Sequence, residues 1–394
     1  MYPQIYKMKF YRTSIIALFI CISVLSANAQ YNIRKINSVY TAVPFLTIAP
    51  DSRSASMGDV GVATSPDVNS LHWNSAKYAF IESDQSIALS YSPWLQGLVK
   101  DMKLLYLTGY NRIDDFQVIA ASLRYFHLGS INFTDDNGQP MGERSPNEFA
   151  IDVAYSRRFS DNISGALAFR YIRSDISAGM SNSLMKAKAG NSFAADIALY
   201  YHSELEVLDK SGKWALGTNI SNIGNKMSYS NEQQKTFIPI NLRIGGSVGL
   251  NLDNYNKMTF ATDFNKLLVP TPPDYNEHGK IEVADVPVVQ GIFQSFYDAP
   301  GGFQEEIHEI SYGLGLEYMY RETFAIRTGF FHEHRTKGNR RYFTVGFGFN
   351  VNMVGIDFSY LIATNGRNNP MNNTLRLSFI VNLGKQVQKT QVKV

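Results

Sequence analysis

The sequence is poor in cysteine, in charge and in long apolar runs. Its one cysteine, Cys21, excludes a disulfide framework and a cluster of cysteine ligands. Charged residues make up 18% of the chain, below the roughly 25% of ordinary soluble domains. After residue 30 no apolar run reaches the about 20 residues that a transmembrane helix needs, which excludes a helical membrane protein. The sequence also lacks G-x-S-x-G and Walker motifs, so no motif indicates an enzyme.

Aromatic residues and glycine are abundant instead. Aromatic residues make up 13% of the chain, with 25 Phe and 23 Tyr, and there are 29 Gly. This composition indicates many strands and excludes a disordered chain.

The first 29 residues have the pattern of an export signal. Three cations precede an apolar stretch at residues 15–25, and Ala27 and Ala29 supply the small residues of a cleavage site. The apolar stretch is too short for a transmembrane anchor. We therefore expect residues 1–29 to be a signal peptide. Its removal takes away three cations and no anion, so the net charge falls from +3 to zero and nothing in the composition supports nucleic-acid binding.

Residues 85–384 contain fourteen stretches with period-two alternation. In each, large apolar or aromatic residues occupy one register and small or polar residues occupy the other. The stretches lie at residues 87–91, 104–110, 119–125, 149–155, 167–171, 193–201, 214–220, 240–250, 258–260, 312–320, 324–330, 343–349, 356–360 and 375–383. We interpret them as fourteen strands.

The alternation permits two architectures. A soluble β-protein would turn its polar register to solvent, whereas an outer-membrane barrel would turn apolar residues to lipid and charges to a lumen. Lumen charges could line a conduction path, or they could pair with one another and with the preceding segment. Acids and bases are both present, which favours a structural network. The expected members of this lumen network are Arg124, Asp152, Arg170, Asp196, Arg243, Asp263, Glu317, Arg327, Asp357 and Arg376.

The lengths of the connections favour the barrel. Long connections such as 127–148 and 264–309 alternate with short ones such as 111–117 and 321–323, although 202–213 is longer than its class predicts. Bacterial barrels have short periplasmic turns and long outer loops, and a soluble sandwich has no reason to sort its connections in this way. A closed barrel also leaves no unpaired amide in hydrocarbon.

We therefore predict an all-β membrane protein, a 14-stranded antiparallel transmembrane β-barrel over residues 85–384. It would lie in the cell outer membrane with its long loops extracellular and both termini periplasmic. Residues 385–394 would be a periplasmic tail. Residues 30–84 show no alternation and could be a disordered tail or an N-terminal plug. Their apolar residues, among them Phe45 and Trp73, favour the plug.

Several blocks of the sequence resemble the PorV family of outer-membrane barrels, which are FadL-like and belong to the type IX secretion system of Bacteroidota. The blocks span most of the chain after residue 30. They are residues 48–53 (IAPDSR), 57–64 (MGDVGVAT), 73–77 (WNSAK), 122–126 (SLRYF), 147–152 (NEFAID), 337–343 (KGNRRYF), 357–361 (DFSYL), 369–370 (NP) and 374–376 (TLR). The resemblance implies a fourteen-stranded barrel with an N-terminal hatch.

The resemblance also implies a function without catalysis and without a cofactor. PorV-like barrels collect cargo that carries a C-terminal signal domain from the translocon, a large SprA-type barrel, and deliver it to the attachment complex that contains the PorU sortase. A FadL-like transporter of hydrophobic small molecules is the alternative. An enzyme that modifies lipid A is a third possibility, but it would need a nucleophile and a base, and no such pair stands out.

The connection at residues 264–309 is the candidate binding region, because its length far exceeds that of ordinary connections. Apolar side chains on an outer loop either form a partner surface or fold inward and cap the barrel. We expect partner binding by Val286, Val288, Val289, Ile292, Phe293, Phe296 and Tyr297. The triplet His332, Glu333 and His334 is the best metal candidate, but it has no third ligand in the sequence around it, and we predict no metal site.

Overall fold

The computed structural model describes residues 36–134, 137–176, 188–207, 209–229, 235–272, 285–365 and 369–384. Residues 37–394 form one compact unit, and the account below concerns that unit. The expected signal peptide (1–29) and periplasmic tail (385–394) lie outside the described residues. None of the described helices is long and apolar enough to cross a membrane.

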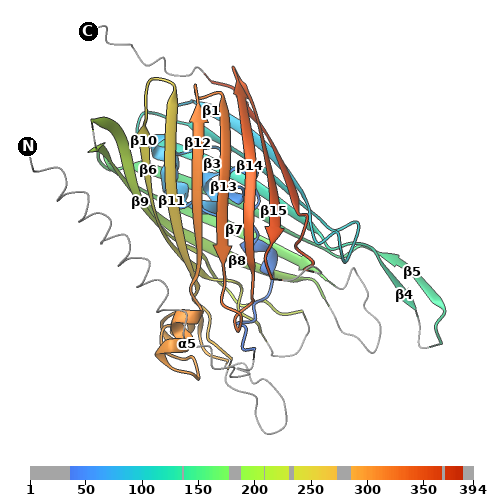
Figure 1. Cartoon of the computed structure of the whole chain (residues 1–394). Helices are drawn as coiled ribbons and strands as arrows, with labels where there is room; N and C mark the ends of the chain where they lie inside the picture. The colour runs from blue at the N-terminus through green and yellow to red at the C-terminus, as the bar shows by residue number, and fades with distance from the viewer. Residues whose placement is uncertain are drawn as a thin grey trace, which may run out of the picture. The chain divides into compact units, whose positions relative to one another are not determined.

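Fourteen antiparallel strands close into a barrel (Figure 1). Each barrel strand pairs with the next barrel strand in the chain, and β1 pairs with β16. The barrel strands are β1 (Gln85–Pro93), β2 (Lys103–Arg112), β3 (Gln117–His127), β6 (Asn147–Arg158), β7 (Ile163–Asp175), β8 (Gly190–Val207), β9 (Lys210–Gly224), β10 (Asn241–Asn251), β11 (Asn256–Leu267), β12 (Ser311–Tyr320), β13 (Phe324–His332), β14 (Arg341–Val351), β15 (Val354–Ala363) and β16 (Leu375–Asn382). The predicted fourteen-stranded antiparallel barrel is confirmed.

The exposure of the side chains distinguishes the two architectures that alternation permits. Large apolar residues point outward, such as Phe169 (68% exposed) and Phe193 (65%), while Arg124 and Asp152 point inward and are 1% exposed. An apolar outer surface over a polar interior is the pattern of a barrel in a lipid bilayer.

The orientation of β2 differs from the prediction. Leu104, Tyr106 and Tyr110 were expected to face lipid, but they are buried inside the barrel, and Leu107 points outward instead. Tyr110 packs against Tyr78 with ring centroids 5.3 Å apart, so the interior here is apolar. Because β2 carries large residues in both registers, its alternation could not show which face meets lipid.

A smaller correction concerns Ile240, which was expected to begin a strand. It is fully buried and precedes β10.

Long and short connections alternate more regularly in the structure than the sequence indicated. β8 and β9 extend through most of residues 202–213 and reduce this connection to the two positions between Val207 and Lys210. A separate hairpin of β4 (Ile131–Thr134) and β5 (Pro140–Arg144), in the long connection after β3, was not predicted. Figure 1 shows it at the same end of the barrel as helix α5 (Phe303–His308).

The segment before β1, residues 37–84, is irregular. Its short helices are η1 (Pro44–Thr47), α2 (Ser52–Ala55), α3 (Ser70–Trp73) and η2 (Ser75–Phe80). Asp51 caps α2 by accepting from the backbone N–H of Ser54, and it also accepts from the indole N–H of Trp73. We call residues 37–84 the N-terminal segment.

The N-terminal segment contacts inward-facing side chains of strands all around the barrel. Hydrogen bonds join it to Thr108 on β2, Arg124 on β3, Asn219 on β9 and Ser378 on β16, among others. Contacts with opposite walls place the segment inside the barrel, where its blue helices are seen between the strands in Figure 1. That it serves as a plug stays a prediction.

Candidate functional site

The charged residues of the interior form two triads in which one arginine lies between two carboxylates. Arg170 on β7 bonds to Asp152 through Nε, and its Nη2 lies 3.1 Å from Asp196 Oδ2. Register places Asp152 directly opposite Arg170 on the paired strands, and period-two alternation turns both inward. All three residues are buried, so each charge depends on its partners.

The second triad has the same plan on the opposite wall. Arg327 Nε lies 2.7 Å from Glu317 Oε2, and its Nη1 lies 2.5 Å from Asp357 Oδ1. Arg53 of the N-terminal segment adds a second cation, with Nη2 at 3.2 Å from Glu317 Oε1. The segment and the wall thus share one ionic network.

Three further members of the expected network contact the N-terminal segment instead of one another. Arg124 donates to the carbonyl of Leu46 (2.8 Å) and to His72 Nδ1 (2.6 Å). Arg243 donates to the carbonyl of His72 (2.7 Å). Asp263 accepts from the backbone N–H groups of residues 61 and 62. Burial, reinforced by the two arginines, holds the pKa of His72 well below its ordinary value.

Arg376, the tenth member, lies against the ring of Trp94, with its guanidinium carbon 5.5 Å from the ring centroid. The structure therefore brings six of the ten charges together in two groups, and four lie apart. Whether the network is purely structural stays a prediction.

The apolar residues of the long connection after β11 divide between two environments. Val286, Val288 and Ile292 pack against an apolar cluster that includes Phe237 and Leu268. The other four expected binding residues are exposed, and two residues of α5 share this exposure. The exposed set is Val289 (66%), Phe293 (66%), Phe296 (48%), Tyr297 (74%), Phe303 (80%) and Ile307 (50%). We call this set, carried by α4 (Val288–Gln294), α5 and the residues that join them, the α4–α5 platform.

Buried ion pairs fasten the platform to the barrel. Lys266 on β11 lies 3.0 Å from Glu306 and 2.7 Å from Glu309. Lys337, in the connection after β13, lies 2.6 Å from Glu305 and 2.9 Å from Glu309. Both lysines and Glu309 are largely shielded from solvent, so these pairs are screened less than surface pairs. The platform is thereby fixed at its inner end.

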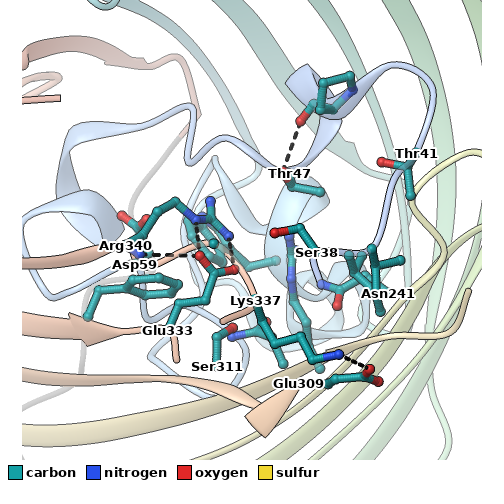
Figure 2. Close-up of a pocket in the computed structure, with 18 residues that line it drawn as sticks. Ser38, Thr41, Thr47, Asp59, Asn241, Glu309, Ser311, Glu333, Lys337 and Arg340 are labelled. Atoms are coloured by element: carbon teal, nitrogen blue, oxygen red, sulfur yellow. Dashed lines mark hydrogen bonds and ion pairs between the residues drawn. The ribbon is translucent and has the colours of Figure 1, made fainter. Parts of the chain in front are cut away.

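A pocket of about 300 Å³ lies between the N-terminal segment, β10 and the connection after β13 (Figure 2). Arg340 and Glu333 pair across it, with Nε 2.9 Å from Oε2. Asp59 Oδ2 accepts from the hydroxyl of Tyr342 (2.6 Å), while its Oδ1 has no hydrogen-bond partner in the described part of the chain. The charges and hydroxyls of the lining, such as Ser311, suit a polar group better than a hydrocarbon.

The fold does not bring His332, Glu333 and His334 together as ligands, because each side chain has another partner. Glu333 pairs with Arg340, His334 stacks on His308 with centroids 3.6 Å apart, and His332 stacks on Tyr312. Burial and the neighbouring His308 lower the pKa of His334 to about 4. Within the ranges that the structure describes, no group of three or more His, Cys, Asp or Glu side chains could hold a metal ion.

Sequence reasoning missed the polar residues of the N-terminal segment. Arg53, Asp59, His72 and Asn74 all bond to the barrel wall, and Asn74 donates to the carbonyl of Leu199 on β8 (2.9 Å). No periodicity marks these positions. The one local signal was Trp73 beside Asn74, because disordered segments contain few aromatic residues.

The closed fourteen-stranded barrel with an apolar outer surface defines the class of the protein, an outer-membrane β-barrel. Residues 30–274 match the family described as type IX secretion system protein PorV. The chain belongs to this family, and it is therefore an outer-membrane component of the type IX secretion system.

Solved structures share the fold at low identity. The TodX deltaS2S3 mutant monoaromatic hydrocarbon channel is 12% identical, with a TM-score of 0.50, and the alignment covers 84% of this chain and 98% of that one. The CymD monoaromatic hydrocarbon channel is 11% identical (TM-score 0.49; coverage 86% and 98%), and the Pseudomonas putida toluene transporter TodX is 10% identical (TM-score 0.48; coverage 88% and 98%). A search of curated proteins finds no match. Likeness at this level concerns the fold alone.

Proposed function

We propose that this barrel is the cargo shuttle of the type IX system. It binds the C-terminal signal domain of a cargo protein as the cargo leaves the SprA-type translocon, and it delivers the cargo to the attachment complex that contains the PorU sortase. In this role the barrel binds and carries cargo, and the sortase performs the chemistry.

The α4–α5 platform is the observation that carries the proposal. Six large apolar side chains are exposed on a surface that ion pairs hold in place, and exposed apolar patches of this kind mark sites of protein association. Aromatic residues, here Phe293, Phe296, Tyr297 and Phe303, are favoured as anchors in such interfaces. A fixed platform also loses little conformational entropy on binding.

The sorting of the connections supports an orientation. The platform, the β4–β5 hairpin and the other long connections lie at one end of the barrel, and the short turns lie at the other. Outer-membrane barrels keep short turns in the periplasm. The platform then faces the cell exterior, where cargo emerges, and the start of β1 and the end of β16 lie on the periplasmic side.

The test is cargo capture by a platform variant. We replace Phe293, Phe296 and Tyr297 with Ser and isolate the intact barrel from membranes. The matched control replaces Phe116 and Phe159, which are exposed (57% and 64%) in turns at the opposite end, with Ser. We expect the platform variant to insert normally and to lose bound signal domains, while the control retains them. Capture by the platform variant at the level of the control would refute the assignment.

A transporter of hydrophobic solutes, the alternative, would need an apolar binding site within the barrel. The pocket beside Asp59 and Arg340 is lined by charges, and the N-terminal segment occupies the interior. Fatty-acid uptake that is lost on deletion of the gene while secretion continues would favour the transporter.

A further inference from the structure

Three inward-facing glycines let the N-terminal segment touch the backbone of the barrel wall. They are Gly313 and Gly315 on β12 and Gly329 on β13, and we call them the glycine seat. Gly315 and Gly329 are register partners on the paired strands. Glycine within a strand is expected where another stretch of backbone approaches closely.

The contacts at the seat are too close for any side chain. A Cβ on Gly329 would lie 2.1 Å from the backbone N of Gly58 and 2.1 Å from the carbonyl carbon of Met57. A Cβ on Gly313 would lie 2.3 Å from the carbonyl oxygen of Gly58, and one on Gly315 would lie 2.6 Å from that of Met57. All of these are backbone atoms, which cannot move aside by a change of rotamer.

Polar bonds fix the same stretch on either side of the seat. Thr344 on β14 accepts from the N–H of Gly58 and donates to the carbonyl of Ser56, both at 2.9 Å. Asp263 on β11 accepts from two further N–H groups of the segment, at residues 61 and 62. Ser378 on β16 accepts from the N–H of Ser52 at 2.9 Å.

On the N-terminal segment, Gly58 also has no room for a side chain. Its backbone has φ +72°, a conformation that L side chains rarely adopt, and a Cβ there would lie 2.7 Å from the carbonyl oxygen of Leu314 and from the N and O of Phe330. Segment and wall therefore each lack the side chain that would separate them.

From this geometry we propose that the N-terminal segment is a permanent part of the wall, which stays seated while the barrel works. The glycine seat holds residues 56–58 against β12 and β13, so neither cargo nor a solute passes through the lumen. Cargo travels on the outside of the closed barrel. If the segment left the glycine seat, buried N–H groups of the segment and the carboxylate of Asp263 on the wall would lose their hydrogen-bond partners. Unpaired polar groups are costly in a low-dielectric interior.

One test locks the segment in place. Ser52 and Ser378 are both fully buried, and their hydroxyl oxygens lie 3.2 Å apart. The double variant Ser52→Cys, Ser378→Cys places a cysteine pair in a chain whose one native cysteine, Cys21, lies in the expected signal peptide. We expect the oxidised and reduced forms of this full-length barrel to capture cargo equally. Capture by the reduced form alone would show that the segment must move, and it would overturn the proposal.

A second test disturbs the seat. Gly329→Ala should push residues 57 and 58 off the wall, open the barrel to ions in a planar bilayer, and expose a reporter Ser56→Cys to an impermeant maleimide. The matched control is Gly246→Ala, because a Cβ on this outward-facing glycine meets its nearest atom at an ordinary 3.4 Å. The parent and the control should be insulating and unlabelled.

Two results of this second test would overturn the proposal. One is a folded Gly329→Ala barrel that is as insulating and as unreactive as the control. The other is a parent barrel that already conducts or already labels at position 56. Should Gly329→Ala fail to fold, the disulfide comparison decides. Failure of the cargo shuttle itself is distinguishable, because the reduced double variant would then also capture no cargo.

Discussion

The triad of Arg170, Asp152 and Asp196 gives the sharpest stability prediction. Arg170→Met removes the cation that the two buried carboxylates share, and each side chain of the triad is at most 5% exposed. Removing one partner of a buried pair costs about 3–5 kcal/mol, because a charge is left uncompensated. We expect a loss of this size in the free energy of unfolding, reduced where water or protonation relieves the carboxylates.

The assay is reversible unfolding of the purified barrel in urea and lipid vesicles, followed by tryptophan fluorescence. Arg173→Met is the control, because it makes the same replacement on the same strand at a position that is not buried and should change stability by less than about 0.5 kcal/mol. The triple variant Asp152→Asn, Arg170→Met, Asp196→Asn removes every charge of the triad and should recover part of the loss. Equal stability of the Arg170→Met and Arg173→Met barrels would refute the reasoning.

Three further predictions concern the platform and the N-terminal segment. Lys337→Met leaves Glu305 and Glu309 without a shared cation, so protease should cleave residues 285–310 faster than in the exposed control Lys100→Met, and equal rates would contradict the anchoring role. Burial, with Glu306 and Glu309 nearby, raises the pKa of Asp298 to about 6. Because the pKa of Asp298 is raised in the folded state, its protonated form stabilises the platform at low pH, and this stabilisation is lost as pH rises through about 6. Cleavage should therefore increase mainly between pH 4 and 6, and Asp298→Asn should abolish the increase. Gly58→Ala should lower the urea midpoint of unfolding, because φ +72° and the contact with Leu314 both disfavour a Cβ; an unchanged midpoint would show that the seat yields easily.

The barrel could be predicted from the sequence because successive side chains of a strand point to opposite faces, so an apolar face and a polar face appear as alternating residues. The prediction was wrong for β2, where Leu104 packs inward in a cluster that includes Phe45 of the N-terminal segment, and Tyr106 is also buried. Period-two reasoning identifies the two faces of a strand, but it needs a polar register to say which face meets lipid, and β2 has none. The hairpin of β4 and β5 was missed because its strands are short.

The candidate site could be predicted only in part. Register and alternation account for the triad of Asp152, Arg170 and Asp196, because β6, β7 and β8 are neighbouring strands, and for the pair of Glu317 and Arg327 on β12 and β13. Asp357 lies one strand further on, on β15, and Arg327 reaches it across β14. The contacts of Arg124 and Arg243 with His72 depend on the path of an irregular segment, which no periodicity records. Within the platform the exposed Val289 and the half-buried Val288 are consecutive residues of the same type, and only the packing of α4 distinguishes them.

The pairing of β1 with β16 has a consequence for assembly. The first and last strands meet at a seam, with Leu89 opposite Phe379, so the cylinder cannot close before the final hairpin has been made. Residues 37–84 precede the first strand and end up enclosed. We expect them to lie against the forming sheet before the seam closes, because their contacts with opposite walls, such as Thr108 and Asn219, would otherwise have to form inside a closed cylinder. We therefore expect the strands to close around residues 37–84 during assembly, with this segment as part of the core of the barrel.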